Sequence, residues 1–336
     1  MTSPVLQLAP IRGVTDCLFR TLFQHSFGGI DLAVAPFVNP QRYVSLRDKH
    51  LADLLPEANP LLPVIPQLLH TNAADFITLA HLLHELGYTR LNWNLGCPAP
   101  MVARKRRGSG LLPYPDAICA LLDTICPAIP QSLSIKTRLG YASPDELATL
   151  LPRLDDYPLE EIIIHPRLGK QMYQGAADPD AFARCLPLTR HRLVYNGDIT
   201  SAAQLAALRR RFPTINGWMI GRGLLAHPFL ALECRGVVVD AAERLQRIAA
   251  FHDELYARYH ERLSGPSHLL GRMKQLWFYL IHSFPAQERC WKKIKKAMNE
   301  QQYAQAVAEL LTREGMRAAQ PALAAGEITQ SRFAIP

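Results

Sequence analysis

The chain has 336 residues, of which 49% are hydrophobic and 20% are charged, so a fibrous or disordered protein is excluded. A single barrel of about 250 residues would leave room for a second, smaller domain. The net charge of +8 favours a polyanionic partner such as nucleic acid, although the same excess of cations also serves solubility.

Cysteine usage favours a reducing compartment, and the hydropathy pattern argues against a membrane segment. The seven cysteines include no Cys-x-x-Cys pair, so we expect neither a disulfide framework nor a thiolate zinc site, and no metal. The amino terminus lacks the features of a signal peptide, and no segment offers about 18 uninterrupted apolar residues. We therefore expect a cytoplasmic monomer that does not enter a membrane.

Short apolar runs alternate with longer segments that carry apolar residues at helical spacing. The eight runs cover residues 5–10, 30–37, 62–69, 90–95, 133–139, 161–166, 192–197 and 217–223. Their regular recurrence predicts the α/β class and a (β/α)8 TIM barrel. The alternative is a doubly wound open sheet, which usually has about five or six strands. No GxGxxG follows the first run, and this also favours the barrel.

The pattern changes near residue 240, after which strand signals stop and apolar residues recur only at helical spacing. We predict a catalytic barrel over residues 1–240 and a small all-α helical bundle over residues 241–315. The remaining residues, 316–336, are rich in Ala and are predicted to form a flexible tail.

Polar residues follow several of the predicted strands. They are Gln67, Asn94, Cys97, Lys136, Arg138, His165, Arg167, Asn196, Gly197, Asp198, Gly221 and Arg222. Because the carboxyl ends of parallel barrel strands share one face, we expect these side chains to converge on a single pocket.

Two glycine turns after the last two strands are typical of a phosphate site. Gly221-Arg222-Gly223 offers backbone amides, a helix amino terminus and a cation, and residues 196–198 provide a neighbouring turn. Two ordinary glycine turns are the alternative. A phosphate at this position would belong to a phosphorylated cofactor or substrate.

Three further residues could carry chemistry. Lys136 lies within an apolar strand and must face a polar site, where it would serve either at the edge of a flavin or as a Schiff-base lysine. His165 could donate a hydrogen bond to the same ring or could cap its strand. Cys97 lies in a loop between Gly96 and Pro98, and its thiol, with an ordinary pKa of about 8.5, could act as an acid or a nucleophile. A buried structural cysteine is the alternative.

Motifs across nearly the whole chain resemble those of tRNA-dihydrouridine synthases. Five of them occur in the order "NLGCPAPMVARKRRGSGLL", "IKTRLG", "IIIHPRLGKQMYQGAAD", "VYNGDI" and "MIGRG". The opening segment "LAPIRGVTDCLFR" is similar to the first strand and helix of that family. The segment "GRMKQLWFYL" resembles the C subgroup.

The resemblance implies a flavin-dependent barrel with a helical RNA-binding domain that reduces the 5,6 double bond of selected uridines in tRNA. It implies FMN as cofactor and NADPH or NADH as reductant, with hydride added to carbon 6 of uracil and a proton given to carbon 5 by Cys97. Asn94 would contact the uracil. Cofactor contacts would come from Pro10, Ile11, Arg12, Gln67, Lys136, His165, Asn196, Gly197, Asp198, Gly221 and Arg222.

Clustered cations would then meet the RNA. Arg104, Lys105, Arg106 and Arg107 follow Cys97, and two further clusters cover residues 209–211 and 292–296. We also assign RNA contacts to Arg138, Arg167, Arg272 and Lys274. A solvated charged surface is the alternative for each cluster.

Two residues depart from the family pattern, since many members have methionine in place of Ile11 and glycine in place of Pro166. Both changes bear on substrate fit more than on cofactor binding. Three other functions stay open. They are an FMN-dependent barrel oxidoreductase for a small molecule, of the dihydroorotate or enoate reductase type, a dihydrouridine synthase acting on rRNA, and a non-catalytic RNA-binding scaffold.

Overall fold

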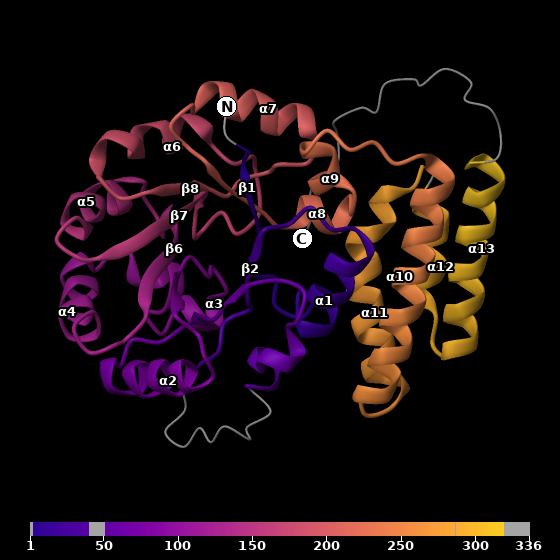
Figure 1. The fold of residues 1–336 in the computed structure, drawn as a ribbon, viewed down its shortest axis with the longest axis horizontal. Coiled ribbons are helices and arrows are strands. Elements are labelled where there is room, and N and C mark those ends of the chain that lie inside the picture. Colours follow the sequence, from indigo (N-terminus) through magenta and orange to yellow (C-terminus); the bar gives the residue numbers. More distant parts are fainter. Residues whose placement is uncertain (1–2, 40–50, 286, 319–336) are drawn as a thin grey trace.

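The computed structural model describes residues 3–39, 51–285 and 287–318, and it contains a parallel barrel beside a group of helices (Figure 1). The strands are β1 (Val5–Leu8), β2 (Leu32–Val34), β3 (Val64–Ile65), β4 (Gln67–Leu68), β5 (Arg90–Leu95), β6 (Ser132–Gly140), β7 (Leu159–Leu168), β8 (Leu193–Tyr195) and β9 (Gly217–Ile220). They form one sheet in the order β3-β2-β1-β9-β8-β7-β6-β5-β4. The predicted α/β barrel is confirmed.

The barrel closes at a proline. Strands β3 and β4 are two parts of one extended segment, interrupted by Pro66, which has no N–H to donate to a ladder. The first part pairs with β2 and the second with β5, so the two edges of the sheet belong to the same segment. The Pro66 carbonyl accepts a hydrogen bond from Asn92 N at 2.9 Å. The eight predicted runs therefore give eight barrel positions, one of which is split.

Helices cover the outside of the barrel. They are α1 (Cys17–Ser26), α2 (Ala73–Glu85), α3 (Pro100–Ala103), α4 (Pro115–Ile125), α5 (Asp145–Leu154), α6 (Pro179–Cys185), α7 (Ala202–Arg211), α8 (Arg222–Ala226) and α9 (Leu230–Cys234). Short 3-10 turns are η1 (Ala52–Leu54), η2 (Pro56–Ala58), η3 (Gly108–Leu111), η4 (Leu186–Leu188) and η5 (Ile281–Ser283). Side chains of Asp16, Asn72, Asp178 and Ser201 cap helices by accepting a backbone N–H.

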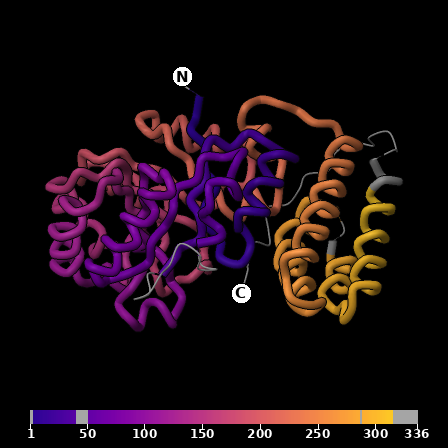
Figure 2. The backbone as a smooth tube through the Cα atoms, turned by 60° about the horizontal axis from the view of Figure 1, so that its bottom comes forward, coloured from indigo at the N-terminus to yellow at the C-terminus, as the bar shows by residue number. Residues whose placement is uncertain are grey.

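The second region contains α10 (Ala241–Arg262), α11 (Pro266–Leu280), α12 (Gln287–Lys296) and α13 (Glu300–Ala318). These helices stand together at one side of the barrel in both views (Figures 1 and 2). The proposed boundary at residue 240 falls on Asp240, whose side chain caps α10. Residues 316–318, predicted as tail, belong to α13, and the rest of the predicted tail, residues 319–336, lies outside the described residues.

Aromatic side chains join the two regions. Phe19 and Phe23 of α1 and Phe27, its C-cap residue, all pack against Phe251 of α10, with ring centroids 5.7, 6.1 and 5.1 Å apart. All four rings are buried. Burial of such a side chain contributes roughly 1.5–3 kcal/mol, so α1 serves as a shared core between the barrel and the helical region. None of the described helices has both the length and the apolar character that crossing a membrane requires.

The cap of α10 gives a test of this junction. The Asp240 carboxylate accepts hydrogen bonds from Ala242 N and Glu243 N, both at 2.9 Å. We expect Asp240→Ala to lower the free energy of unfolding by roughly 0.5–2 kcal/mol, measured by urea denaturation. Asp240→Asn is the matched control, because its amide oxygen can still accept; equal losses in both variants would contradict the capping role.

Candidate functional site

The predicted site residues converge at the carboxyl ends of the strands. Cys97 follows β5, Lys136 lies in β6, His165 in β7, Asp198 follows β8 and Arg222 follows β9. Electrostatic effects between them show that they are neighbours, since Arg12, Arg138 and Lys136 act on Cys97. The charges of Lys136, Arg138, Arg167 and Arg222 also act on His165. These side chains therefore lie close together, as expected from the parallel topology.

A directed chain of hydrogen bonds crosses the barrel interior toward Cys97. Asn92 Nδ2 donates to Ser134 Oγ at 2.8 Å, and Gln67 Nε2 donates to Asn92 Oδ1 at 2.7 Å. Asn94 Nδ2 donates to Gln67 Oε1 at 2.7 Å. Finally, Asn94 Oδ1 accepts from Cys97 N at 2.8 Å. Each amide is oriented by the one before it, so the chain fixes the loop that carries the cysteine.

This chain uses most of the hydrogen-bonding capacity of two amides. Gln67 has 0% of its surface exposed and orients Asn94; its predicted contact with the cofactor stays a prediction. Asn94 uses its oxygen for Gly96 N at 3.1 Å and for Cys97 N. One hydrogen on Asn94 Nδ2 is left for a ligand.

The loop that follows Cys97 folds back and contacts Cys97. Ser109 donates to the Cys97 carbonyl oxygen from both its backbone N and its Oγ, each at 3.1 Å. Gly108 has φ +56°, and a Cβ there would lie 2.6 Å from the same oxygen, so only glycine fits. Burial raises the pKa of the Cys97 thiol, although a hydrogen bond from the backbone of Ala99 and nearby cations oppose the shift. The group is therefore a thiol at neutral pH.

The four consecutive cations divide into two sets. Arg104, Lys105 and Arg106 are exposed, and Arg106 stacks over Tyr114 at 4.6 Å. Arg107 instead turns inward, with Nη2 3.1 Å from His70 Nε2. Burial lowers the pKa of His70, so its neutral ring can accept this hydrogen bond. Sequence reasoning did not single out His70, although it closely follows β4.

Lys136 lies partly buried in β6 beside Cys97 and Arg138. Burial, followed by the charge of Arg138, lowers the pKa of Lys136 to about 7. In the described part of the chain, no hydrogen bond or ion pair involves its amine. An amine desolvated without an acceptor is costly, so this position suits a ligand that offers an oxygen or nitrogen acceptor.

Arg167, Asp198 and Arg222 form an ionic group in which Arg167 is buried and the other two are partly buried. Arg167 donates to both Asp198 oxygens, at 2.9 and 2.6 Å, and Arg222 Nη2 donates to Asp198 Oδ1 at 2.9 Å. Burial opposes ionisation of Asp198, but its hydrogen bonds and the two arginines outweigh that effect and leave its pKa below the usual value. The Asp198 carboxylate thus holds both arginines in place, and the predicted role of its turn at a phosphate stays a prediction.

Two features leave this group ready for an anion. Arg222 Nη1 is buried and has no hydrogen-bond partner among the described residues. Arg167, predicted to meet RNA, is 2% exposed and lies with Nη1 2.9 Å from His165 Nε2. Burial, together with the surrounding cations, holds the pKa of His165 well below its usual value. His165 is therefore neutral, and an Arg167 donor at Nε2 leaves the proton on Nδ1.

Arg138 braces three segments around the site. It is 1% exposed and donates to the carbonyl oxygens of Gly96, Leu168 and Met172, at 3.1, 2.9 and 2.6 Å. Arg138 therefore holds these loops, and its predicted contact with RNA stays a prediction. Tyr173, which sequence reasoning missed, lies 40% exposed with Arg138 and Arg222 over its ring, at 5.2 and 5.0 Å.

The remaining predicted cofactor residues lie nearby. Arg12 is exposed and stacks over Phe37 at 5.5 Å, and Pro10 and Ile11 precede it in the loop after β1. A Cβ on Gly221 would lie 3.5 Å from Ile11 Cδ1. Asn196 Nδ2 donates to the Met219 carbonyl oxygen at 2.8 Å. A Cβ on Gly197 would lie 3.2 Å from Pro166 Cδ, so this departure from the family pattern packs against the phosphate turn.

The two cations predicted in the helical region have partners inside the protein. Arg272 donates to the Gly13 carbonyl oxygen, and Lys274 Nζ donates to the Ala297 carbonyl oxygen at 2.5 Å. Their contact with RNA stays a prediction.

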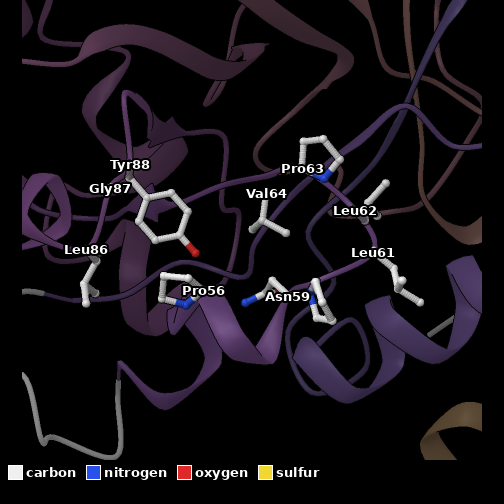
Figure 3. Close-up of a pocket in the computed structure, with 10 residues that line it drawn as sticks. Pro56, Asn59, Leu61, Leu62, Pro63, Val64, Leu86, Gly87 and Tyr88 are labelled. Atoms are coloured by element: carbon white, nitrogen blue, oxygen red, sulfur yellow. The ribbon is translucent and has the colours of Figure 1, made fainter.

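A separate hollow of about 390 Å³ lies on the opposite side of the barrel, near the amino ends of β3 and β5 (Figure 3). Leu62, Val64 and Leu86 line it together with Asn59 and Tyr88. The Tyr88 hydroxyl donates to the Leu54 carbonyl oxygen at 2.7 Å, and Asn59 bonds to its own segment and to Arg20. This hollow therefore offers no reactive group.

Comparisons with known proteins agree with the motifs. A family model described as "Dihydrouridine synthase (Dus)" matches residues 7–317. A "Probable tRNA-dihydrouridine synthase" of Rhodobacter capsulatus is 29% identical over 323 residues, covering 95% of this chain and 92% of that protein. A "tRNA-dihydrouridine(16) synthase" of Pseudomonas putida is 28% identical over 296 residues, with 83% and 89% covered. For "tRNA-dihydrouridine synthase B" of Escherichia coli the identity is 28% over 229 residues, with 67% and 69% covered.

Solved structures support the barrel. Histamine dehydrogenase from Rhizobium sp. 4-9 superimposes with a TM-score of 0.54 at 10% identity, covering 69% of this chain and 45% of that one. Morphinone reductase gives a TM-score of 0.51 at 14% identity, covering 70% and 86%. At such low identity the likeness concerns the fold alone.

The raised pKa of the Cys97 thiol gives a pH test. Alkylation requires the thiolate, so the rate at Cys97 should rise at a higher pH than that of a small-molecule thiol, measured by mass spectrometry of the labelled peptide. In Arg12→Gln, which loses a cation near the thiol, the rise should move to still higher pH. A rise below that of the free thiol would contradict a protonated Cys97.

Proposed function

Because this chain belongs to the dihydrouridine synthase family, we propose that the residues around Cys97 reduce the 5,6 double bond of uridine in tRNA to dihydrouridine with a flavin. The chain is thus an oxidoreductase. One observation carries the assignment. The half-buried Cys97 is kept as a thiol beside an amine and an arginine that have capacity left for a ligand.

The residues present fit FMN, which we assign as the flavin. The buried, unpartnered Nη1 of Arg222 and the backbone at Gly221 and Gly223 suit its single phosphate. Lys136 suits the electron-rich edge of the ring, and neutral His165 offers a donor at Nδ1. When bound and reduced, the flavin supplies a hydride to carbon 6 of uracil. We assign NADPH, or NADH, as the source of its electrons.

Cys97 completes the reduction. Hydride at carbon 6 leaves an enolate on the uracil, and the thiol gives its proton to carbon 5, so two hydrogens are added across the double bond. The thiolate that remains is stabilised by Arg12, Arg138 and Lys136 and takes its proton back from water. Asn94 holds the backbone of Cys97 and has one Nδ2 hydrogen left for a uracil carbonyl.

The substrate must present a single uridine to this site. A base in folded RNA has to leave its stack to reach a site at the carboxyl ends of the strands, which costs a few kcal/mol. Arg104, Lys105 and Arg106 are exposed on the loop that follows Cys97, and among the described residues neither Arg104 nor Lys105 has a carboxylate partner. They suit the phosphates that flank the extruded nucleotide.

The proposal includes a monomer in the cytoplasm. The seven cysteines are free, as in a reducing compartment.

Substitution of the cysteine tests the assignment. Cys97→Ala should reduce dihydrouridine formation in tRNA by roughly 10²–10⁴-fold, because general acid catalysis contributes about that much. The product is measured by mass spectrometry of digested RNA, and flavin absorption should persist. Cys126→Ala, at the end of α4, is the matched control.

Other outcomes would identify the competing functions. Unchanged turnover in Cys97→Ala would remove this residue as the acid. Activity on rRNA but not on tRNA would identify rRNA as the substrate. A purified protein without flavin absorption would contradict the redox function altogether.

Neutralising the exposed cations tests the RNA contact. We expect Arg104→Gln, Lys105→Gln and Arg106→Gln together to weaken tRNA binding and to reduce the slope of log K against log salt by roughly 2–3. The matched control neutralises residues 209–211 at the end of α7, which lie near the amino end of β9 and thus on the opposite face. An equal change in the control would show that the effect comes from net charge alone.

A further inference from the structure

The helical region holds the loop between β1 and α1. Arg272 of α11 donates from Nη1 to the Gly13 carbonyl oxygen, and its Nη2 lies 3.9 Å from Asp16 Oδ2. Tyr259 of α10 donates its hydroxyl to Asp16 Oδ1 at 2.8 Å, and the Arg272 guanidinium stacks over the Tyr259 ring at 5.5 Å. Two helices of the second region thus bond to one loop of the barrel.

This contact depends on a close approach at Gly13. Gly13 has φ +83°, and a Cβ there would lie 3.0 Å from Gln275 Oε1, one turn along α11 from Arg272. A side chain at this position would displace the exposed Gln275 side chain and would strain the backbone. The loop itself is a tight turn, because Val14 N and Thr15 N both donate to the Ile11 carbonyl oxygen at 3.0 Å.

The other side of the same loop faces the site. Ile11 lies against Gly221 of the turn assigned to the phosphate. Arg12 lies near enough to Cys97 for its charge to act on the thiol. Ile11 N also donates to Thr15 Oγ1 at 2.9 Å, so movement at Gly13 would be passed to residues 11 and 12 through short, closed hydrogen bonds.

We propose that Arg272 is a positioning residue that fixes the loop of residues 10–16 and so sets Ile11 and Arg12 against the flavin and Cys97. Through it, the placement of the helical region is coupled to the reacting site. The proposal rests on the function proposed above for its effect on flavin, but the fixing of the loop does not depend on that function. It differs from a direct RNA contact, because the guanidinium already serves Gly13, Asp16 and Tyr259.

Hydrogen exchange of the protein without RNA tests the fixing of the loop. In Arg272→Ala, the amides of Ile11, Val14 and Thr15 should exchange faster by on the order of tenfold, because the Gly13 carbonyl loses a charged donor. Arg272→Lys keeps one donor and should fall between. Lys274→Ala on the same helix, whose partner is Ala297, should leave these amides unchanged.

A second readout concerns the site. The visible absorption band of bound flavin should shift in Arg272→Ala and not in Lys274→Ala, again without RNA. The amide of Tyr303, which donates to the Asn299 carbonyl oxygen in α13, should keep its exchange rate and so show that the bundle remains folded. If the exchange rate of the Tyr303 amide changes in Arg272→Ala, Arg272→Lys replaces Arg272→Ala in the comparison.

Other outcomes would overturn the positioning role of Arg272, and they differ from the outcome that would count against the proposed function. Unchanged exchange at residues 11–15 in Arg272→Ala, with weakened tRNA binding, would overturn the proposal and make Arg272 an RNA contact. Faster exchange with an unshifted flavin band would also overturn it, since the site would then be independent of the loop. Protein purified without flavin would instead count against the proposed function, and the exchange result would stand.

Discussion

Buried amides inside a barrel must find partners, and here that requirement produces a single directed chain from Ser134 to Cys97. Reversal of any one amide along it would set two donors or two acceptors against each other. The position of the reactive loop is therefore determined by polar groups on β4, β5 and β6. The fully buried amides of Asn92 and Gln67 thus keep the loop that carries the Cys97 thiol in place.

The chemistry of the site depends on an excess of positive charge. The charges of Arg12, Lys136 and Arg138 act on Cys97, and those of Lys136, Arg138, Arg167 and Arg222 act on His165. The Asp198 carboxylate pairs with Arg167 and Arg222. Burial, followed by this crowding of cations, favours the neutral form of His165 and lowers the pKa of Lys136. An electron-rich, phosphorylated ligand would relieve the crowding. The same field stabilises negative charge on sulfur after the proton has left, so cofactor affinity and acid catalysis share one electrostatic cause.

Much of the fold and the set of site residues could be predicted from the sequence, because strand periodicity is local and parallel strands share a face. All eight apolar runs contain a strand, and the residues after them converge. The partner of each cation could not be predicted, since Arg107 to His70 and Arg272 to Gly13 are long-range contacts decided by side-chain direction. Runs of cations look alike in sequence whether they face water or bend inward. The break at Pro66 and the role of Tyr173 also needed the three-dimensional arrangement.

The aromatic junction at α1 bears on how the two regions belong together. Phe19, Phe23 and Phe27 form part of the outer layer of the barrel, yet their rings are covered by Phe251 of α10. A barrel cut free after residue 240 would present these rings to water as a contiguous apolar patch, which invites aggregation. The helical region is therefore not a detachable module. The protein should lose both regions in one cooperative transition, and an exchange of this region between relatives would have to carry the matching face of α1 with it.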